Sequence, residues 1–277
     1  MNFTTGLSSL FICYGMLLAP NGALGGQASE SLVKVPTRSG VEQPFILVEP
    51  EIKPFASVIL FPGGSGKLRT HRYGTQVKSK NFLVRTRQIF AGHGFLVIVI
   101  DTPTDRKREG LFRFRTTEEH ARDIKNVITW LSKRNNIPVF LIGTSRGAIS
   151  AAGVTAQMKG NGIAGIVLTS TVTRYNNRGN KDRVFDVDME QIHTPVLVVY
   201  HKDDACTVTP YEDADDLMGS LVNAKHKKLL NYQGGNSPES DECKALSEHG
   251  FFGIEERVVG DIARWIKERV KAVKPGP

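Results

Sequence analysis

Short runs of apolar residues alternate along most of the chain with longer stretches in which polar and apolar positions are mixed. The four central runs contain no charged residue, as expected of strands that are covered on both faces of a parallel sheet. The runs predicted to be strands are Phe45–Val48, Val58–Phe61, Phe95–Ile100, Val139–Ile142, Ile163–Leu168, Val196–Tyr200 and Lys228–Tyr232.

Between these runs, apolar residues recur at the three- and four-residue spacing of amphipathic helices. One such helix is predicted around Ala121–Leu131 and another around Ile254–Val270. The alternation of strands and helices predicts an α/β fold with a doubly wound, mostly parallel sheet. Ligands of such sheets bind beyond the carboxyl ends of the strands, so we expect functional residues directly after the apolar runs.

The N-terminal segment differs from the rest of the chain. It carries no Lys, Arg, Asp or Glu before Glu30, and the mostly apolar run from Leu7 to Ala19 is followed by small residues. The run is short for a membrane span, and this layout is typical of a secretory signal peptide. We predict a signal peptide over residues 1–25, a single domain over residues 26–277 without a stable membrane span, and a periplasmic or secreted location. A buried N-terminal helix is the alternative.

A candidate nucleophile follows the fourth run. The sequence there is Gly143-Thr144-Ser145-Arg146-Gly147, and small residues continue after it. A serine lifted to the tip of a sharp strand-to-helix turn needs neighbours without bulk, which the flanking glycines supply. The pattern predicts Ser145 as the nucleophile; the alternative is a tight turn that merely uses glycines.

Partners for this serine are expected later in the chain, in the order acid and then histidine. Asp203 and Asp204 both follow the strand Val196–Tyr200, and Asp204 is favoured because it lies deeper in the turn, two residues before Cys206. His249 precedes a glycine in the segment before the C-terminal helix and is predicted to be the base, whereas His201 is expected to be a structural hydrogen-bonding residue.

An acyl-transfer site also needs backbone N–H groups that stabilise the oxyanion. The Arg146 amide, at the start of the helix after the serine, is one candidate. The second is expected in Pro62-Gly63-Gly64-Ser65-Gly66, where glycines permit close approach of the backbone to a substrate, and the Gly64 or Ser65 amide is the candidate there.

Together these motifs resemble the α/β-hydrolase superfamily over nearly all of residues 32–273, and most closely its dienelactone-hydrolase-like members without a large cap domain. The acid turn of those members has the form Asp-x-Cys followed by Thr-Pro, as in Asp204-Ala205-Cys206 and Thr209-Pro210. The resemblance supports Asp204 over Asp203 and implies a disulfide between Cys206 and Cys243. Dienelactone hydrolases proper use a cysteine nucleophile, so their substrate is not carried over.

The expected activity is therefore the hydrolysis of a small carboxylic ester by a serine esterase, without metal or organic cofactor. A peptidase or thioesterase would use the same residues, and a non-catalytic binding protein on this scaffold is the alternative from another class. The net charge of +8 suggests an anionic substrate or only a solvated basic rim, and no nucleic-acid-binding module is recognised. The basic loop residues are Lys67, Arg69, Arg72, Arg106, Lys107, Arg108, Arg113 and Arg115.

Overall fold

A computed structural model describes Met1, residues 28–175 and residues 182–273. The predicted signal peptide therefore lies outside the described residues, apart from Met1. In the described part of the chain, no helix combines the length and the apolar character needed to cross a bilayer.

An eight-stranded sheet forms the centre of the structure, in the order β1-β2-β4-β3-β5-β6-β7-β8. Its strands β3 to β8 run parallel to one another, and β1 and β2 are antiparallel additions at one edge. The strands are β1 Ser29–Arg38, β2 Val41–Glu49, β3 Ala56–Phe61, β4 Phe95–Ile100, β5 Val139–Thr144, β6 Gly165–Thr169, β7 Val196–His201 and β8 Lys227–Tyr232. The predicted α/β class with a mostly parallel sheet is confirmed.

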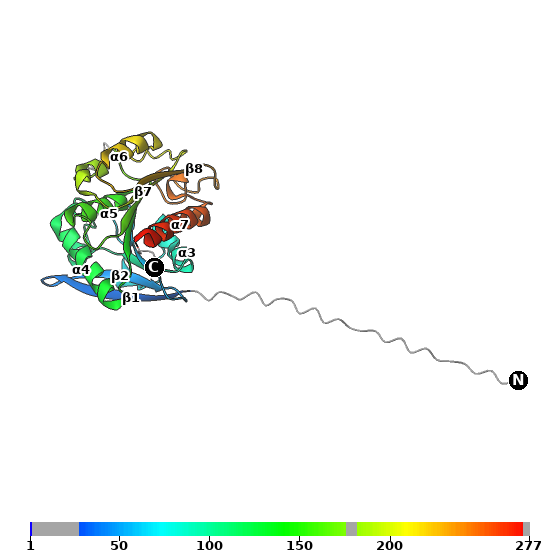
Figure 1. Cartoon of the computed structure of the whole chain (residues 1–277), viewed down its shortest axis with the longest axis horizontal. Helices are drawn as coiled ribbons and strands as arrows, with labels where there is room; N and C mark the ends of the chain where they lie inside the picture. The colour runs from blue at the N-terminus through cyan, green and yellow to red at the C-terminus, as the bar shows by residue number, and fades with distance from the viewer. Residues whose placement is uncertain (2–27, 176–181, 274–277) are drawn as a thin grey trace.

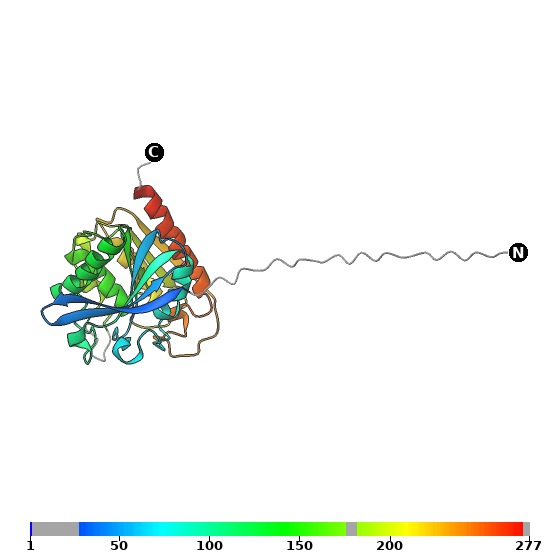
Figure 2. The same ribbon diagram turned by 90° about the horizontal axis from the view of Figure 1, so that it is seen from below.

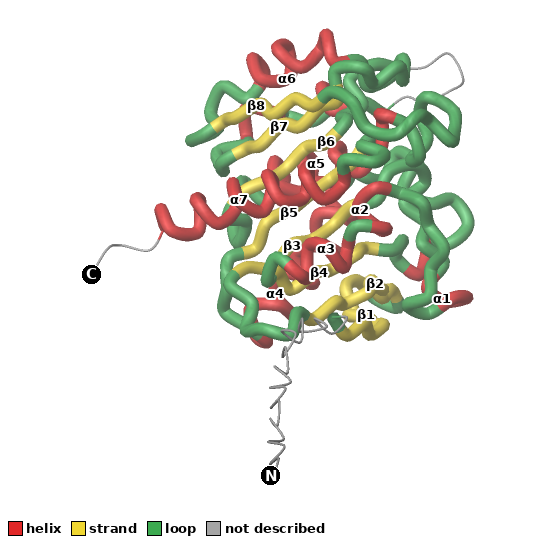
Figure 3. Tube along the Cα trace, turned by 90° about the vertical axis from the view of Figure 1, so that its right-hand side faces the viewer, coloured by secondary structure: helices red, strands yellow, loops and turns green. Residues whose placement is uncertain are grey.

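Helices cover both faces of the sheet and form two separate apolar cores with it. Figure 1 shows α4 and α5 on one side of the strands and α3 and α7 on the other, and Figure 3 shows the sheet from the side of α7. The first core includes residues of α4 Glu118–Arg134, α5 Arg146–Gln157 and α6 Ala214–Ser220. The second includes residues of α2 Phe82–Arg85, α3 Arg87–Gly92 and α7 Glu255–Val273.

Strand β1 was not predicted. It pairs with β2 as a long antiparallel ribbon at the edge of the sheet, which Figure 2 shows from below. Val35 is its one buried residue, because an edge strand faces solvent along most of its length. It therefore lacks the continuous apolar run by which the central strands were recognised.

In the residues that the structure describes, the connections near the carboxyl ends of the strands carry only short helical elements. Between β6 and β7, the described residues hold two 3-10 helices, η2 Val184–Asp186 and η3 Met189–Gln191, in place of a cap domain. The remaining short elements are α1 Thr70–Tyr73, η1 Thr104–Arg106, η4 Tyr211–Asp213 and η5 Glu248–Gly250. The edge of the sheet that should bind a ligand is thus left open.

The loop after β3 is anchored by Asp101, at the end of the neighbouring strand β4. One carboxylate oxygen accepts the Leu68 amide N–H at 2.8 Å, and the other accepts the Thr70 amide at 2.8 Å and the Thr70 hydroxyl at 2.6 Å. The Asp101 side chain is buried, so these bonds are not in competition with water. Asp101 therefore ties the segment that follows the glycine-rich loop to the end of β4.

Candidate active site

Ser145 lies at the turn between β5 and α5, with φ of 54° and ψ of −124°. A non-glycine residue rarely adopts a positive φ, and such strain is characteristic of a nucleophile turn. The flanking glycines are required by contact: a Cβ on Gly147 would lie 1.9 Å from the Phe61 carbonyl oxygen, and one on Gly143 would lie 2.3 Å from the Gly147 carbonyl oxygen. The structure thus gives Gly-x-Ser-x-Gly the geometry expected of an exposed nucleophile.

Asp204 and His249 are joined by a buried hydrogen bond. His249 Nδ1 lies 2.9 Å from Asp204 Oδ2, and the Asp204 side chain is fully buried. Asp203, the competing candidate, is 55% exposed and lies 3.9 Å from His201 Nδ1. The geometry favours Asp204 as the acid, because it holds the Nδ1 proton of His249 and leaves Nε2 as the acceptor.

Further donors hold the Asp204 carboxylate in place. The Cys206 amide donates to Oδ1 at 3.0 Å, and the Thr209 hydroxyl donates to Oδ2 at 3.0 Å. Thr209 Oγ1 also lies 3.1 Å from His249 Nδ1, so its hydroxyl contacts both members of the pair. In the sequence, Thr209 belongs only to the Thr-Pro pair of the resemblance, and a single hydroxyl in a loop gives no further signal of this role.

The disulfide implied by the resemblance is present between Cys206 and Cys243, with Cα atoms 4.6 Å apart. It links the turn that carries Asp204 to the segment that precedes His249. Ligand atoms of Asp204, Cys206 and His249 lie within 4.8 Å of one another. They do not suit a metal ion, because the metal-binding form of cysteine is the thiolate and the Cys206 sulfur is committed to the disulfide.

Ser145 and His249 line the same small pocket, of about 60 Å³, together with Gly63 and Gly64. Ser145 makes no direct hydrogen bond to His249 among the residues that the structure describes, and such catalytic bonds often tighten only when substrate binds. The loop after β3 comes very near the serine, since a Cβ on Gly63 would lie 3.0 Å from Ser145 Cβ. Gly64, exposed in this pocket, is the better placed of the two predicted loop donors, because Ser65 is not among the lining residues.

A larger cavity, of about 1130 Å³, extends from Ser145 and Gly64 along Arg146, Phe112 and the residues next to the disulfide. The Arg146 guanidinium carbon lies 4.7 Å from the centroid of the Phe112 ring. Its burial lowers the Arg146 pKa from the usual value, an effect that Asp182 opposes. Within the described residues, no side-chain hydrogen bond or ion pair is made by this guanidinium.

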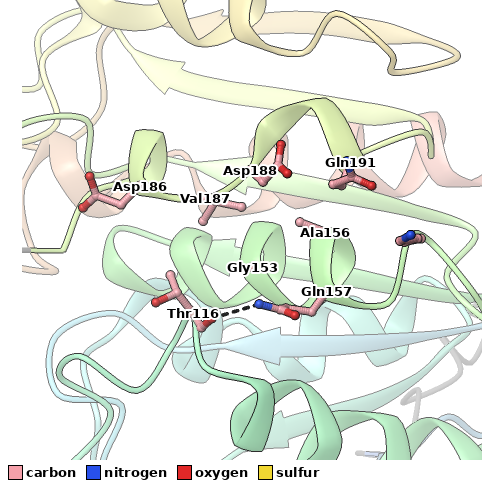
Figure 4. A pocket seen from close by; sticks show the side chains of 9 residues that line it. Thr116, Gly153, Ala156, Gln157, Asp186, Val187, Asp188 and Gln191 are labelled. Atoms are coloured by element: carbon pink, nitrogen blue, oxygen red, sulfur yellow. Dashed lines mark hydrogen bonds between the residues drawn. The ribbon is translucent and has the colours of Figure 1, made fainter.

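Another concavity, of about 440 Å³, lies between α5 and the segment that carries η2 and η3. Figure 4 shows its lining, where Gln157 Nε2 donates to the Thr116 carbonyl oxygen at 3.4 Å. None of its lining residues belongs to the predicted triad or oxyanion donors. It is therefore separate from the candidate active site.

The basic loop residues do not form a uniform solvated rim. Arg69, Arg72, Lys107, Arg108 and Arg113 are exposed, but Arg115 is only 2% exposed. The interpretation of Arg115 as a rim residue is wrong, because its side chain points into the protein and donates to internal acceptors. His201 behaves as expected of a structural residue: its Nε2 donates to the Gly234 carbonyl oxygen at 2.8 Å.

The sheet, the strained serine and a β6–β7 connection whose described residues hold no cap define an α/β serine hydrolase without a lid. In a comparison with known families, the family model described as X-Pro dipeptidyl-peptidase (S15 family) matches residues 51–200. The chain therefore belongs to this family. The matched region contains Ser145 and ends before Asp204 and His249. A comparison of the whole sequence with curated proteins finds no match.

Solved structures with this fold include several esterases. An esterase from Pyrococcus furiosus is 13% identical with a TM-score of 0.63, over 87% of this chain and 91% of that chain. A fungal esterase from Rhizomucor miehei is 16% identical with a TM-score of 0.61, over 90% and 85%. A serine hydrolase without a lid from Xanthomonas campestris is 12% identical with a TM-score of 0.53, over 90% and 97%. At these identities, the likeness establishes the fold.

The disulfide gives a prediction about stability. Replacing both cysteines (Cys206→Ser with Cys243→Ser) should lower the free energy of unfolding by about 4 kcal/mol, because a loop closed over 37 residues is released in the unfolded chain. Urea denaturation of the parent and the double variant, each with and without reductant, measures the difference. Reductant should bring the parent to the midpoint of the variant; equal midpoints without reductant would contradict the prediction.

Proposed function

We propose that the protein hydrolyses small carboxylic esters through an acyl-enzyme on Ser145, with His249 as general base and Asp204 as the acid that orients it. The observation that carries the proposal is the buried Asp204–His249 hydrogen bond beside a pocket that His249 shares with the strained Ser145. Ser145, His249 and Asp204 each have one role in this reaction.

In the proposed reaction, His249 Nε2 takes the proton of the Ser145 hydroxyl as its oxygen attacks the ester carbonyl carbon. The amide N–H of Arg146 and an amide of the loop after β3 donate to the resulting oxyanion. His249 then returns the proton to the leaving alcohol, and the acyl group remains on Ser145. Water, deprotonated by His249, releases the carboxylic acid by the same steps in reverse order.

A peptidase is the second candidate, favoured by the description of the matching family as X-Pro dipeptidyl-peptidase. An ester is preferred for this chain because the described site is open and lacks a cap, whereas amide cleavage is expected to need further elements that position the peptide. Three of the solved structures that share the fold, from different sources, are described as esterases. Thioesters present the same acyl carbon and form a third class to be tested.

We further propose that the substrate carries a negative charge near the scissile bond. Arg146 is adjacent to the nucleophile, faces the larger cavity and stacks on Phe112, which holds its guanidinium in one position. A guanidinium presents several N–H donors in a plane and suits a carboxylate oxygen pair. The 240–244 segment of the cavity wall carries Asp241 and Glu242 as well as Lys244, so the side of Arg146 is the more favourable place for the negative charge of the substrate.

Export is proposed as well, with the periplasm or the cell exterior as the location. A disulfide between Cys206 and Cys243 supports it, because structural disulfides persist in oxidising compartments.

The proposed function is tested by comparing purified parent protein and Ser145→Ala on short p-nitrophenyl esters, a thioester and an X-Pro p-nitroanilide. We expect ester turnover in the parent, lower kcat/KM for the anilide, and a loss of at least about 10³-fold in Ser145→Ala. Faster cleavage of the X-Pro anilide would establish the peptidase, and no turnover of any substrate would favour a binding protein.

Asp204 and Asp203 provide a matched pair of variants. Asp204→Asn should lower kcat by about 10²–10⁴-fold, because the amide neither fixes the Nδ1 proton of His249 nor stabilises the imidazolium. Asp203→Asn should stay within about threefold of the parent, since an exposed carboxylate is solvated. Steady-state ester kinetics on both variants measures the contrast, and the reverse ranking would reassign the acid.

Arg146 is tested by substrate charge. Arg146→Gln keeps the backbone donor but removes the guanidinium, so the preference for a hemisuccinate ester over a neutral ester of equal length should fall about tenfold or more. Arg72→Gln, at an exposed rim position, is the control and should not alter the preference. An unchanged ratio of kcat/KM values in Arg146→Gln would remove the case for an anionic substrate.

A further inference from the structure

Arg115 is buried without a counter-ion. Its side chain is among the largest fully buried ones, and no acidic side chain of the described residues forms an ion pair with it. Burying an unpaired charge is costly, and an apolar or amide side chain would normally be cheaper at such a position. Packing alone therefore does not account for an arginine at position 115.

The guanidinium contacts both segments from which oxyanion donors are expected. Nη2 donates to the carbonyl oxygens of Pro62 at 3.3 Å and Gly64 at 3.2 Å, in the loop after β3. Nη1 donates to Ser150 Oγ at 2.7 Å, one helical turn beyond Arg146 in α5. One planar group thus spans the gap between the loop and the helix that follows the nucleophile.

These contacts orient peptide groups as well as side chains. In a planar trans peptide, the carbonyl oxygen and the following N–H point in opposite directions. Holding the Pro62 and Gly64 carbonyls toward Arg115 therefore turns the N–H groups of Gly63 and Ser65 away from it. The Gly63 carbonyl accepts the Gly66 amide at 3.1 Å, which fixes the peptide between Gly63 and Gly64, and this peptide carries the Gly64 N–H.

The space around the guanidinium is filled to contact. A Cβ on Gly66 would lie 3.1 Å from Arg115 Nη2, so even a methyl group at position 66 would crowd it. Burial and the charge of Arg146 lower the pKa of Arg115 to about 9, which leaves it protonated at neutral pH. The neighbouring His120 adds no charge, because burial and Arg115 lower its pKa to about 3.

We propose that Arg115 is the positioning residue of the oxyanion hole: it sets the spacing between the loop after β3 and helix α5 so that their amides meet at one oxygen. It does not touch substrate and acts through the backbone of residues 62–66 and through Ser150. This inference rests on the proposed function of Ser145.

The experiment compares Arg115→Lys, Arg115→Gln and Ser150→Ala with the parent on a p-nitrophenyl ester. Fluorophosphonate labelling counts the competent serines in each preparation, so kcat is expressed per labelled Ser145. A trifluoromethyl ketone, which forms a tetrahedral adduct with serine, reports on the oxyanion hole separately from ester binding. Arg87→Lys is the control, because Arg87 is a partly buried arginine that pairs with Glu30 and contacts neither oxyanion segment.

We expect Arg115→Gln to lower kcat per labelled serine by about 10²-fold or more, the effect of a misplaced oxyanion donor. Arg115→Lys should lose less than Arg115→Gln, because it keeps a positive charge. It should still be slower than the parent, because an ammonium cannot reach all three acceptors in one plane. Ser150→Ala should lose severalfold. The affinity for the ketone should fall in parallel in every case while KM stays within about threefold, and Arg87→Lys should match the parent.

A residue that only supports folding would reduce the labelled fraction and leave kcat per labelled serine unchanged. An unchanged kcat per labelled serine in Arg115→Lys overturns the inference. If the arginine variants do not fold, an unchanged kcat per labelled serine in Ser150→Ala overturns it. An inactive, unlabelled parent would instead refute the proposed function, so the two failures are distinguishable.

Discussion

The site depends on one close contact, between the end of β3 and the β5–α5 turn. The Phe61 carbonyl oxygen leaves no room for a side chain at position 147, and Ser145 leaves little room for one at position 63. Because two backbones meet without intervening side chains, the serine and the loop that should hold the oxyanion are fixed relative to each other. Arg115 and Asp101 then fix the loop from two sides, through its carbonyl and its amide groups respectively.

The positions of the acid Asp204 and the base His249 do not depend on that contact. Asp204 and His249 belong to the loops after β7 and β8, which the Cys206–Cys243 disulfide ties together. Thr209 and the Cys206 amide occupy the remaining acceptor positions of the Asp204 carboxylate. Backbone contacts therefore position Ser145, and the disulfide holds together the loops that carry Asp204 and His249. The described residues hold no cap that would cover these three side chains.

Much of this arrangement could be predicted from the sequence, for physical reasons. Strands buried on both faces must be continuously apolar, which is why the central strands could be recognised, whereas the largely exposed β8 was recognised only by a short run with two leucines. The glycines around Ser145 are visible because no other residue fits there. Strand β1 was missed because an edge strand need not be apolar, and the role of Thr209 was missed because one hydroxyl leaves no pattern. Arg115 was misread because its buried guanidinium donates to carbonyls that lie about fifty residues away in the chain. Local composition carries no sign of such contacts.

The central claim is that Ser145 is an activated nucleophile. The most direct measurement is fluorophosphonate labelling of the folded, oxidised protein, followed by peptide mapping of the adduct by mass spectrometry. The account predicts one adduct, on Ser145, formed far more slowly in Asp204→Asn. Folded protein that remains unlabelled, or that carries its adduct on another serine, would contradict it.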